Sequence, residues 1–376
     1  MKKILLLIIC LCAVVIRADY AELLKNAENG SAWEKYRVGL YLLYGWDGAE
    51  KNPAEAVKWF KKSLAQEELP EAMTMLGNAY LSGVGIEVDK EKALALFRKA
   101  AVKGDHWAIS MLGFCYYNGD GVPQNFAAGA RYLHRAAELG NGYAQNFLGW
   151  IYFDGRGAEK RDYAQSVKWY TRAAENNFPA AFSSLSSAYA SGRGVEKDYC
   201  MAVHFLLRYV AVDKEASPGS LFSLGEAYAR GDGTKKDYVQ AVKYYKLAAE
   251  QGDSEALLRL ANCYAFGDGT AKDDMAANQY YRMAAEQGNT RAMLVLAARL
   301  YHGAGCERNF AEAAKWLAKA ADAGDSGGCF GYAIMLERGD GVPKDLAKAL
   351  EYYRKAASYG NKMAIRAAER VSHLVK

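Results

Sequence analysis

Residues 108–143 read AISMLGFCYYNGDGVPQNFAAGARYLHRAAELGNGY, and this stretch decides the fold. The triplet Gly119-Asp120-Gly121 separates two segments whose apolar residues recur at spacings of three and four, as on one face of a helix. Asn125 is suited to cap the second helix, and Gly140-Asn141 to end it and to cap the next one. The stretch therefore predicts a unit of helix, turn, helix and turn.

The Gly-x-Gly triplet recurs along the chain at a nearly fixed step. Its first glycines are separated by 36, 36, 37, 39, 36, 36 and 36 residues, at Gly83, Gly119, Gly155, Gly192, Gly231, Gly267, Gly303 and Gly339. A degenerate copy, Gly45-Trp46-Asp47-Gly48, stands 38 residues before Gly83. Short helix pairs bury their apolar faces only by stacking on one another. We expect an all-α fold, a right-handed α/α superhelical solenoid of about nine helix-turn-helix repeats.

The domain organisation follows from these units. Residues 1–18 are expected to be a signal peptide, 19–31 an N-terminal half-repeat cap, and 364–376 a C-terminal capping helix. The nine repeats are expected at about 32–70, 71–107, 108–143, 144–180, 181–219, 220–255, 256–291, 292–327 and 328–363. The fifth repeat departs from the pattern by an insertion through Ala216-Ser217-Pro218-Gly219, which indicates either a longer loop or a hinge between two sub-stacks.

One position of the first helix, six residues before the triplet, is small throughout. It is occupied by Gly77, Gly113, Gly149, Ser186, Gly225, Ala261, Ala297 and Ala333. A glycine in a helix costs stability, but it lets a neighbouring helix come close. We therefore expect this position to be a packing contact.

The N-terminus has the pattern of a secretory signal. Lys2 and Lys3 precede an apolar run over 4–16, and Arg17-Ala18-Asp19 follows. The run is shorter than the roughly 20 residues that a transmembrane helix needs. We expect cleavage after Ala18 and a periplasmic or secreted protein whose only membrane contact is the transient signal peptide; a retained membrane anchor is the alternative.

The net charge of the chain narrows the classes of partner that can be expected. Without residues 1–18 the chain has 45 basic and 43 acidic residues, so its net charge falls from +5 to +2. This balance gives no reason to expect a nucleic-acid partner.

Five cysteines remain, at positions 115, 200, 263, 306 and 329, and an odd number cannot all pair within one chain. Their uneven spacing favours free cysteines over a disulfide framework.

The repeated pattern Ala-x-x-x-Leu-Gly-x-x-Tyr-x-x-Gly-x-Gly resembles the Sel-one-like repeat of exported bacterial proteins, a relative of the tetratricopeptide repeat, from about Ala32 to Met363. The resemblance implies an adaptor that binds protein or peptide partners without a cofactor. A scaffold for envelope polysaccharide or peptidoglycan is the alternative. One cysteine-rich exported branch of the family is associated with β-lactam binding or hydrolysis and has two cysteines eight residues apart. Here Cys329 occupies one such position but Ala321 the other, which argues against that branch.

Motifs for catalysis and metal binding are missing from the sequence. No HExxH or paired-cysteine pattern indicates zinc, and no Ser-x-x-Lys indicates a penicillin-recognising enzyme. No Gly-x-Gly triplet continues to the third glycine of a dinucleotide-binding loop. We expect no catalytic residue, no metal and no cofactor, with β-lactamase-like activity as an alternative that the sequence leaves open.

The candidate binding residues lie on the first helices. If the solenoid curves as tetratricopeptide proteins do, positions nine, five and two residues before the triplet line the concave face. The predicted site residues at these positions are Ser110, Phe114, Tyr117, Asn146, Trp150, Phe153, Asn78 and Leu81. Large rings beside amides suit an extended peptide, and they also suit sugar rings. The alternative is that the rings only pack between adjacent first helices.

Overall fold

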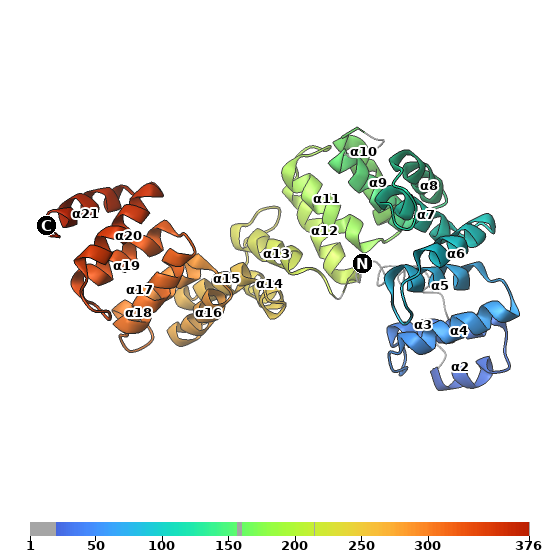
Figure 1. Cartoon of the computed structure of the whole chain (residues 1–376), viewed down its shortest axis with the longest axis horizontal. Coiled ribbons are helices and arrows are strands. Elements are labelled where there is room, and N and C mark those ends of the chain that lie inside the picture. Colours follow the sequence, from blue (N-terminus) through green and yellow to red (C-terminus); the bar gives the residue numbers. More distant parts are fainter. Residues whose placement is uncertain (1–19, 156–159, 214, 376) are drawn as a thin grey trace. The chain divides into compact units, whose positions relative to one another are not determined.

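The computed structural model describes residues 20–155, 160–213 and 215–375, and within these ranges the chain forms helices and no strands (Figure 1). The helices are α2 (Tyr20–Ala27), α3 (Ala32–Tyr44), α4 (Pro53–Gln66), α5 (Pro70–Ser82), α6 (Lys90–Val102), α7 (His106–Asn118), α8 (Phe126–Glu138), α9 (Gly142–Asp154), α10 (Tyr163–Glu175), α11 (Pro179–Ser191), α12 (Tyr199–Val212), α13 (Pro218–Arg230), α14 (Tyr238–Glu250), α15 (Ser254–Phe266), α16 (Asp274–Glu286), α17 (Thr290–His302), α18 (Phe310–Asp322), α19 (Ser326–Arg338), α20 (Leu346–Ser358) and α21 (Lys362–Ser372).

The predicted all-helical solenoid is confirmed. From α3 to α20 the described helices form nine consecutive pairs, with α2 before the first pair and α21 after the last. In each pair we call the helix before the Gly-x-Gly turn the first helix and the one after it the second helix. The predicted signal peptide, residues 1–18, lies outside the described residues.

The chain divides into two compact units after Asp213. Unit 1 contains the pairs from α3 to α12, and unit 2 those from α13 to α20. The division falls within the fifth repeat, where the sequence carries its insertion; whether this segment is a hinge stays a prediction. Within unit 1, Figure 1 shows α5, α7 and α9 along the inner edge of a curve and α6, α8 and α10 along its outer edge.

In six of the turns, consecutive repeats meet at the second glycine. A Cβ added to Gly85 would lie 2.2 Å from the carbonyl oxygen of Pro53, in the first turn of the preceding second helix, and the backbone there has a φ of +75°. The same relationship joins Gly121 to Lys90, Gly194 to Tyr163, Gly269 to Tyr238, Gly305 to Asp274 and Gly341 to Phe310. A side chain at this position would collide with backbone atoms, so the turn requires glycine.

The small position of the first helix packs against a large side chain of the second helix. A Cβ added to Gly77 would lie 2.6 Å from the ring of Phe97, and one added to Gly225 would lie 2.5 Å from the ring of Tyr245. Where the small residue is glycine, the large residue is the eighth of its helix: Phe60, Phe97, Leu133, Tyr170 and Tyr245. The predicted close approach is confirmed.

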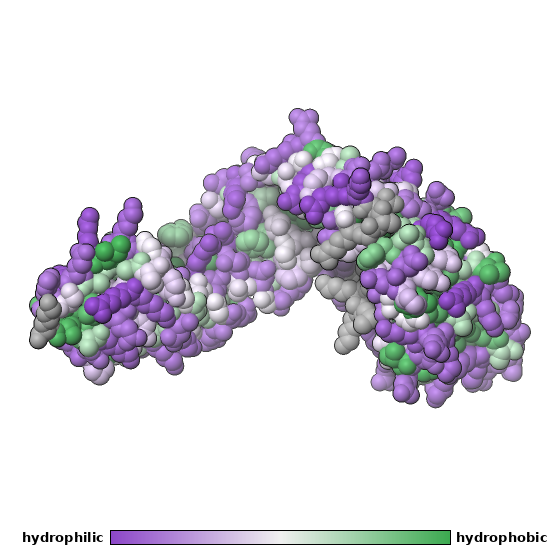
Figure 2. All heavy atoms as spheres, turned by 45° about the horizontal axis from the view of Figure 1, so that its top comes forward, coloured by the Kyte–Doolittle hydropathy of each residue, from purple (hydrophilic) through white to green (hydrophobic). Residues whose placement is uncertain are grey.

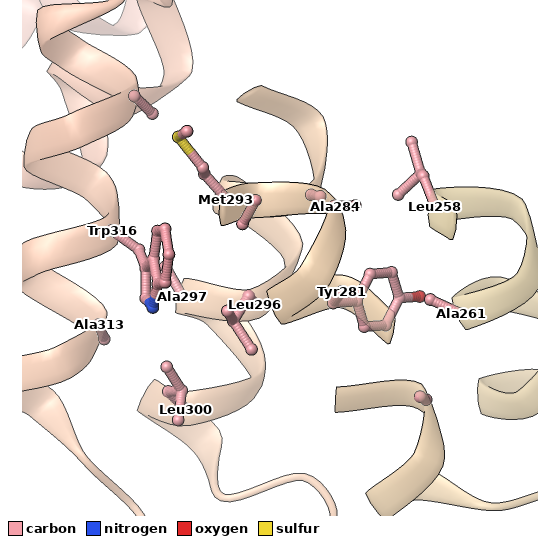
Figure 3. Close-up of a cluster of buried hydrophobic side chains, with 14 of the residues drawn as sticks. Leu258, Ala261, Tyr281, Ala284, Met293, Leu296, Ala297, Leu300, Ala313 and Trp316 are labelled. Carbon is pink, nitrogen blue, oxygen red and sulfur yellow. The ribbon is translucent and has the colours of Figure 1, made fainter. Parts of the chain in front are cut away.

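The core is continuous from one repeat to the next. In unit 2 one buried cluster extends from Leu257 on α15 to Met335 on α19, and it includes Tyr281, Leu296 and Trp316. Figure 3 shows the Tyr281 ring beside Ala261 and the Trp316 ring beside Ala297. Hydrophilic residues cover most of the surface in view in Figure 2. Each repeat therefore depends on its neighbours for burial.

The predicted helix caps are also confirmed. The side chains of Asp89 and Asn125 cap the second helices α6 and α8, and Asp105 and Asn141 cap the first helices α7 and α9. Three first helices begin instead with proline and have no side-chain cap bond: α5, α11 and α13. Proline suits this place because the first backbone N–H groups of a helix have no partner within it.

Candidate functional site

A group of aromatic rings crosses two neighbouring first helices in unit 1. Tyr143, Phe147 and Trp150 recur at spacings of four and three on α9, which places them on one face of the helix. The rings of Phe147 and Trp150 lie 5.5 Å apart at an interplanar angle of 2°, and those of Tyr143 and Phe147 lie 6.1 Å apart at 21°. The three rings form a continuous stack along α9.

Rings from α7 extend this stack into the preceding repeat. Phe114 lies 5.9 Å from Phe147, and Tyr117 lies 6.0 Å from Trp150 in an edge-on arrangement. Trp107, at the start of α7, lies 6.4 Å from Tyr143. We call the six rings of Trp107, Phe114, Tyr117, Tyr143, Phe147 and Trp150 the aromatic surface. The rings therefore pack between adjacent first helices, and they also form a surface.

The rings of the aromatic surface differ in exposure. Trp150 is 38% exposed, while Phe114 and Phe147 are half-buried. Tyr117 and Tyr143 are buried, and burial raises the pKa of Tyr143 well above its usual range, so this phenol stays neutral. A partner can reach Phe114, Phe147 and Trp150 directly, and the two tyrosines support them from beneath.

Three of the predicted site residues are buried. Ser110 is fully buried and its hydroxyl donates to the carbonyl oxygen of Trp107 at 2.8 Å, while Asn78 and Tyr117 are each only 4% exposed. Positions that share a helix face can still differ in how far the neighbouring first helix covers them. Ser110 and Tyr117 therefore support the aromatic surface from within, and none of the three residues presents its side chain to a partner.

The other predicted residues are accessible at least in part. Leu81, Asn146 and Phe153 are half-buried. The Oδ1 atom of Asn146 is buried and has no hydrogen-bond partner among the described residues. Phe153 belongs to a second ring contact, 5.4 Å from Tyr163, and the guanidinium of Arg193 lies 5.7 Å from its centre. A role for these residues in binding stays a prediction.

The sequence reasoning missed Phe147, which contacts four other rings and lies at the centre of the surface. It also missed Trp107 and Tyr143. Phe147 stands eight positions before its triplet, and Trp107 and Tyr143 stand twelve positions before theirs, so none has an offset of nine, five or two. The spacing Tyr143-x-x-x-Phe147-x-x-Trp150 was the available signal, since it repeats aromatic residues at helical intervals.

The first helices around the aromatic surface carry almost no charge. α7 and α11 contain no Asp, Glu, Lys or Arg, and α9 contains only Asp154 at its last position. The four first helices of unit 2 each carry two charged residues: Glu226 and Arg230, Glu255 and Arg259, Arg291 and Arg299, and Glu337 and Arg338. This stretch of unit 1 thus offers apolar rings and neutral polar groups.

Thiols and possible metal ligands are dispersed. Among the described residues no three His, Cys, Asp or Glu side chains come together as a metal site. The five described cysteines are free: Cys115, Cys263 and Cys329 are buried, and Cys200 and Cys306 are exposed. The Sγ atom of Cys329 lies 3.7 Å from the carbonyl oxygen of Ala321, so the two positions are close. No described helix combines the length and apolar character that a membrane span requires.

A comparison with protein families matches nearly the whole described chain. The family model for the Sel1 repeat matches nine segments, at 35–67, 70–105, 108–141, 142–178, 184–208, 218–253, 254–289, 290–325 and 326–361. The matched segments correspond to the nine helix pairs. They include α7 and α9, which carry the aromatic surface.

Solved structures support the same assignment. The chain is similar to a protective antigen present in uropathogenic Escherichia coli strains that displays an SLR fold, with 32% identity, 93% of this chain and 73% of that chain covered, and a TM-score of 0.71. A Sel1 repeat protein from Oxalobacter formigenes shares the fold at 24% identity, covering 99% and 100% of the two chains with a TM-score of 0.61.

One curated relative matches over a short stretch. It is the ERAD-associated E3 ubiquitin-protein ligase component HRD3A of Arabidopsis thaliana, 33% identical over 67 residues. The match spans 18% of this chain and 10% of that protein.

Proposed function

We propose, since the chain belongs to the Sel1 repeat family, that it is a non-enzymatic scaffold, periplasmic or secreted, which binds a protein or peptide partner through its aromatic surface. Repeat solenoids present long surfaces built from equivalent positions of successive repeats, and they use these surfaces for interaction. The signal-like residues 1–18 support the location. The exposed rings of the aromatic surface support the proposed position of the binding site.

The observation that carries the proposal is the exposure of Trp150 on a rigid base. Its ring lies parallel to that of Phe147 and is held at its edge by Tyr117. Large aromatic side chains that are fixed before binding lose little conformational entropy when a partner covers them, and they dominate the energy of many interfaces. Trp150 has the character of such an anchor residue.

The binding site can be tested by replacing Trp150 and Phe114 together with alanine. Partners crosslinked to the protein in the organism that encodes it are identified for the wild type and for the double variant. We expect the double variant to lose its partners while its helical circular dichroism is retained. A variant with Phe266→Ala is the matched control, because Phe266 is 74% exposed on α15, away from the aromatic surface in sequence and in unit.

An unchanged set of partners in the double variant contradicts the site assignment. Competition by purified envelope polysaccharide or peptidoglycan would favour the glycan scaffold instead. Turnover of nitrocefin by the purified protein would contradict the non-enzymatic part of the proposal. The location is tested separately: N-terminal sequencing of the protein from the periplasm or medium should begin at Asp19.

A further inference from the structure

We infer that the aromatic surface recognises an uncharged, proline-rich segment in an extended conformation. The inference rests on the proposed function and names the chemistry of the partner at the same site. It is carried by three observations: the missing charge on α7, α9 and α11, the spacing of the rings, and an exposed hydroxyl group on α11.

The missing charge limits what can bind. Only Asp154 is charged in the three first helices, and it lies at the C-terminal end of α9. A charged ligand residue brought onto the rings away from Asp154 would lose water and gain no ion pair there, which is costly. An uncharged segment avoids this cost. The charged first helices of unit 2 show that neutrality is a local property of these repeats and not of the whole family pattern.

Proline matches the apolar rings because it has no backbone N–H group. An ordinary residue laid over Phe147 and Trp150 would leave a donor without an acceptor, whereas proline presents only an apolar ring and a carbonyl oxygen. Proline-rich segments are also extended before binding, as the polyproline II helix, so little conformational entropy is lost. Aromatic rings are a recurring platform for such segments.

The spacing of the rings suits this conformation. The rings of Phe114 on α7 and Phe147 on α9 are direct neighbours, 5.9 Å apart. One turn of a polyproline II helix advances by about 9 Å. One turn of the ligand would thus cover rings from both helices.

A hydroxyl group on the next first helix suits the carbonyl groups of such a ligand. α11 has five serines, and two of them, Ser187 and Ser191, are exposed. The hydroxyl of Ser191 donates to the carbonyl oxygen of Ser187 at 2.7 Å, so Ser187 is the candidate donor to a ligand. A polyproline II backbone has no internal hydrogen bonds, so its carbonyl oxygens are open to donors. The Ser187 hydroxyl can supply such a donor without introducing charge.

The test measures the binding of three labelled peptides, decaproline, decaglutamate and decalysine, by fluorescence anisotropy. We expect decaproline to bind most tightly, with a Kd that changes less than about twofold between about 0.05 and 0.5 M NaCl, because no ion pair contributes. The double variant Trp150→Ala/Phe114→Ala should weaken decaproline binding at least tenfold, and Phe266→Ala should leave it unchanged. The trisaccharide and hexasaccharide of N-acetylglucosamine serve as uncharged glycan probes.

The outcomes separate this inference from the proposed function. Preferential, salt-sensitive binding of decaglutamate or decalysine overturns the inference, as does binding of the glycan probes through Trp150 without binding of decaproline. If crosslinked partners depend on Trp150 and Phe114 but decaproline does not bind, the partner chemistry is wrong and the proposed function stands. If neither depends on these residues, both fail.

Discussion

Arg370 donates two hydrogen bonds to the carboxylate of Glu337, from Nη1 at 2.5 Å and from Nη2 at 2.9 Å, and so ties α21 to α19. The Oε2 atom of Glu337 also accepts a hydrogen bond from the hydroxyl of Tyr353 on α20, at 2.7 Å. One carboxylate thereby joins three helices at the end of unit 2. The guanidinium of Arg370 holds the pKa of Glu337 below its usual range.

This ion pair makes the stability of unit 2 depend on pH. Because the pKa of Glu337 is lower in the folded state, its contribution is present above the unfolded pKa, near 4.3, and is lost as the pH falls through the folded value. We expect Glu337→Gln to lower the free energy of unfolding at pH 7 by about 0.5–1 kcal/mol, since Arg370 is half-exposed and solvent screens the pair. Denaturant unfolding should show the difference between variant and wild type shrinking below pH 4; a difference independent of pH would contradict this account.

The close approach between paired helices predicts opposite tolerance at two glycines of α13. Gly225→Val would force the new side chain into the ring of Tyr245 and should cost about 1–3 kcal/mol. A Cβ added to Gly219 on the same helix meets no atom within 4 Å, so the effect of Gly219→Val should stay within about 0.5 kcal/mol. Thermal unfolding of both variants checks this, and equal losses of stability would show that packing against Tyr245 is not the cause.

Much of the fold followed from the sequence because the signals are local. The steps between triplets, the capping residues and the small helix position each depend on backbone geometry that a few neighbouring residues determine, as Gly77 beside Phe97 illustrates. The division after Asp213 coincides with the irregular fifth repeat, but the sequence left a loop and a hinge open there. The sequence thus predicts the positions of the helices more closely than the division of the repeats into two units.

The candidate site was only partly predictable because exposure depends on neighbouring repeats. The periodicity of α7 indicates which residues share a face, but it does not determine how far the neighbouring helices cover that face. Ser110 and Tyr117 are therefore buried, although Asn146 and Phe153 at the same offsets are half-buried. Phe147 is central because it lies between Phe114 and Trp150, a relationship that needs the packing of two helices.

The five described cysteines should differ sharply in reactivity. Burial raises the pKa of Cys115 to about 12 and that of Cys263 to about 11, so both thiols stay protonated near neutral pH. Alkylation by iodoacetamide, followed site by site by mass spectrometry, should label Cys200 and Cys306 first and the buried thiols only on unfolding. Early labelling of Cys115 in the folded protein would show that its surroundings open.

Two asparagine caps should differ in how much they contribute to the free energy of unfolding. Asn141 is 1% exposed; its Oδ1 accepts from the backbone of Ala144 at 2.8 Å and its Nδ2 lies 3.0 Å from Nδ1 of His106 in the preceding repeat. Asn141→Ala should cost about 2 kcal/mol, because both a cap and a link between repeats are lost.

The exposed cap Asn125 is the matched control. It makes the cap bond to Ala128, at 2.9 Å, so Asn125→Ala should cost about 1 kcal/mol. Denaturant midpoints measured for both variants test the comparison. A larger loss at Asn125 would rule out a contribution from the contact with His106.

The glycine that joins one repeat to the preceding helix has a consequence for how such genes change. The joint is made by the backbone of a turn against the start of a helix, as between Gly85 and Pro53, and it recurs in six of the turns. A duplicated or deleted stretch of one full period would recreate the same joint at its new borders. The array can therefore lengthen or shorten by whole modules during evolution while the residues on its inner face diverge freely.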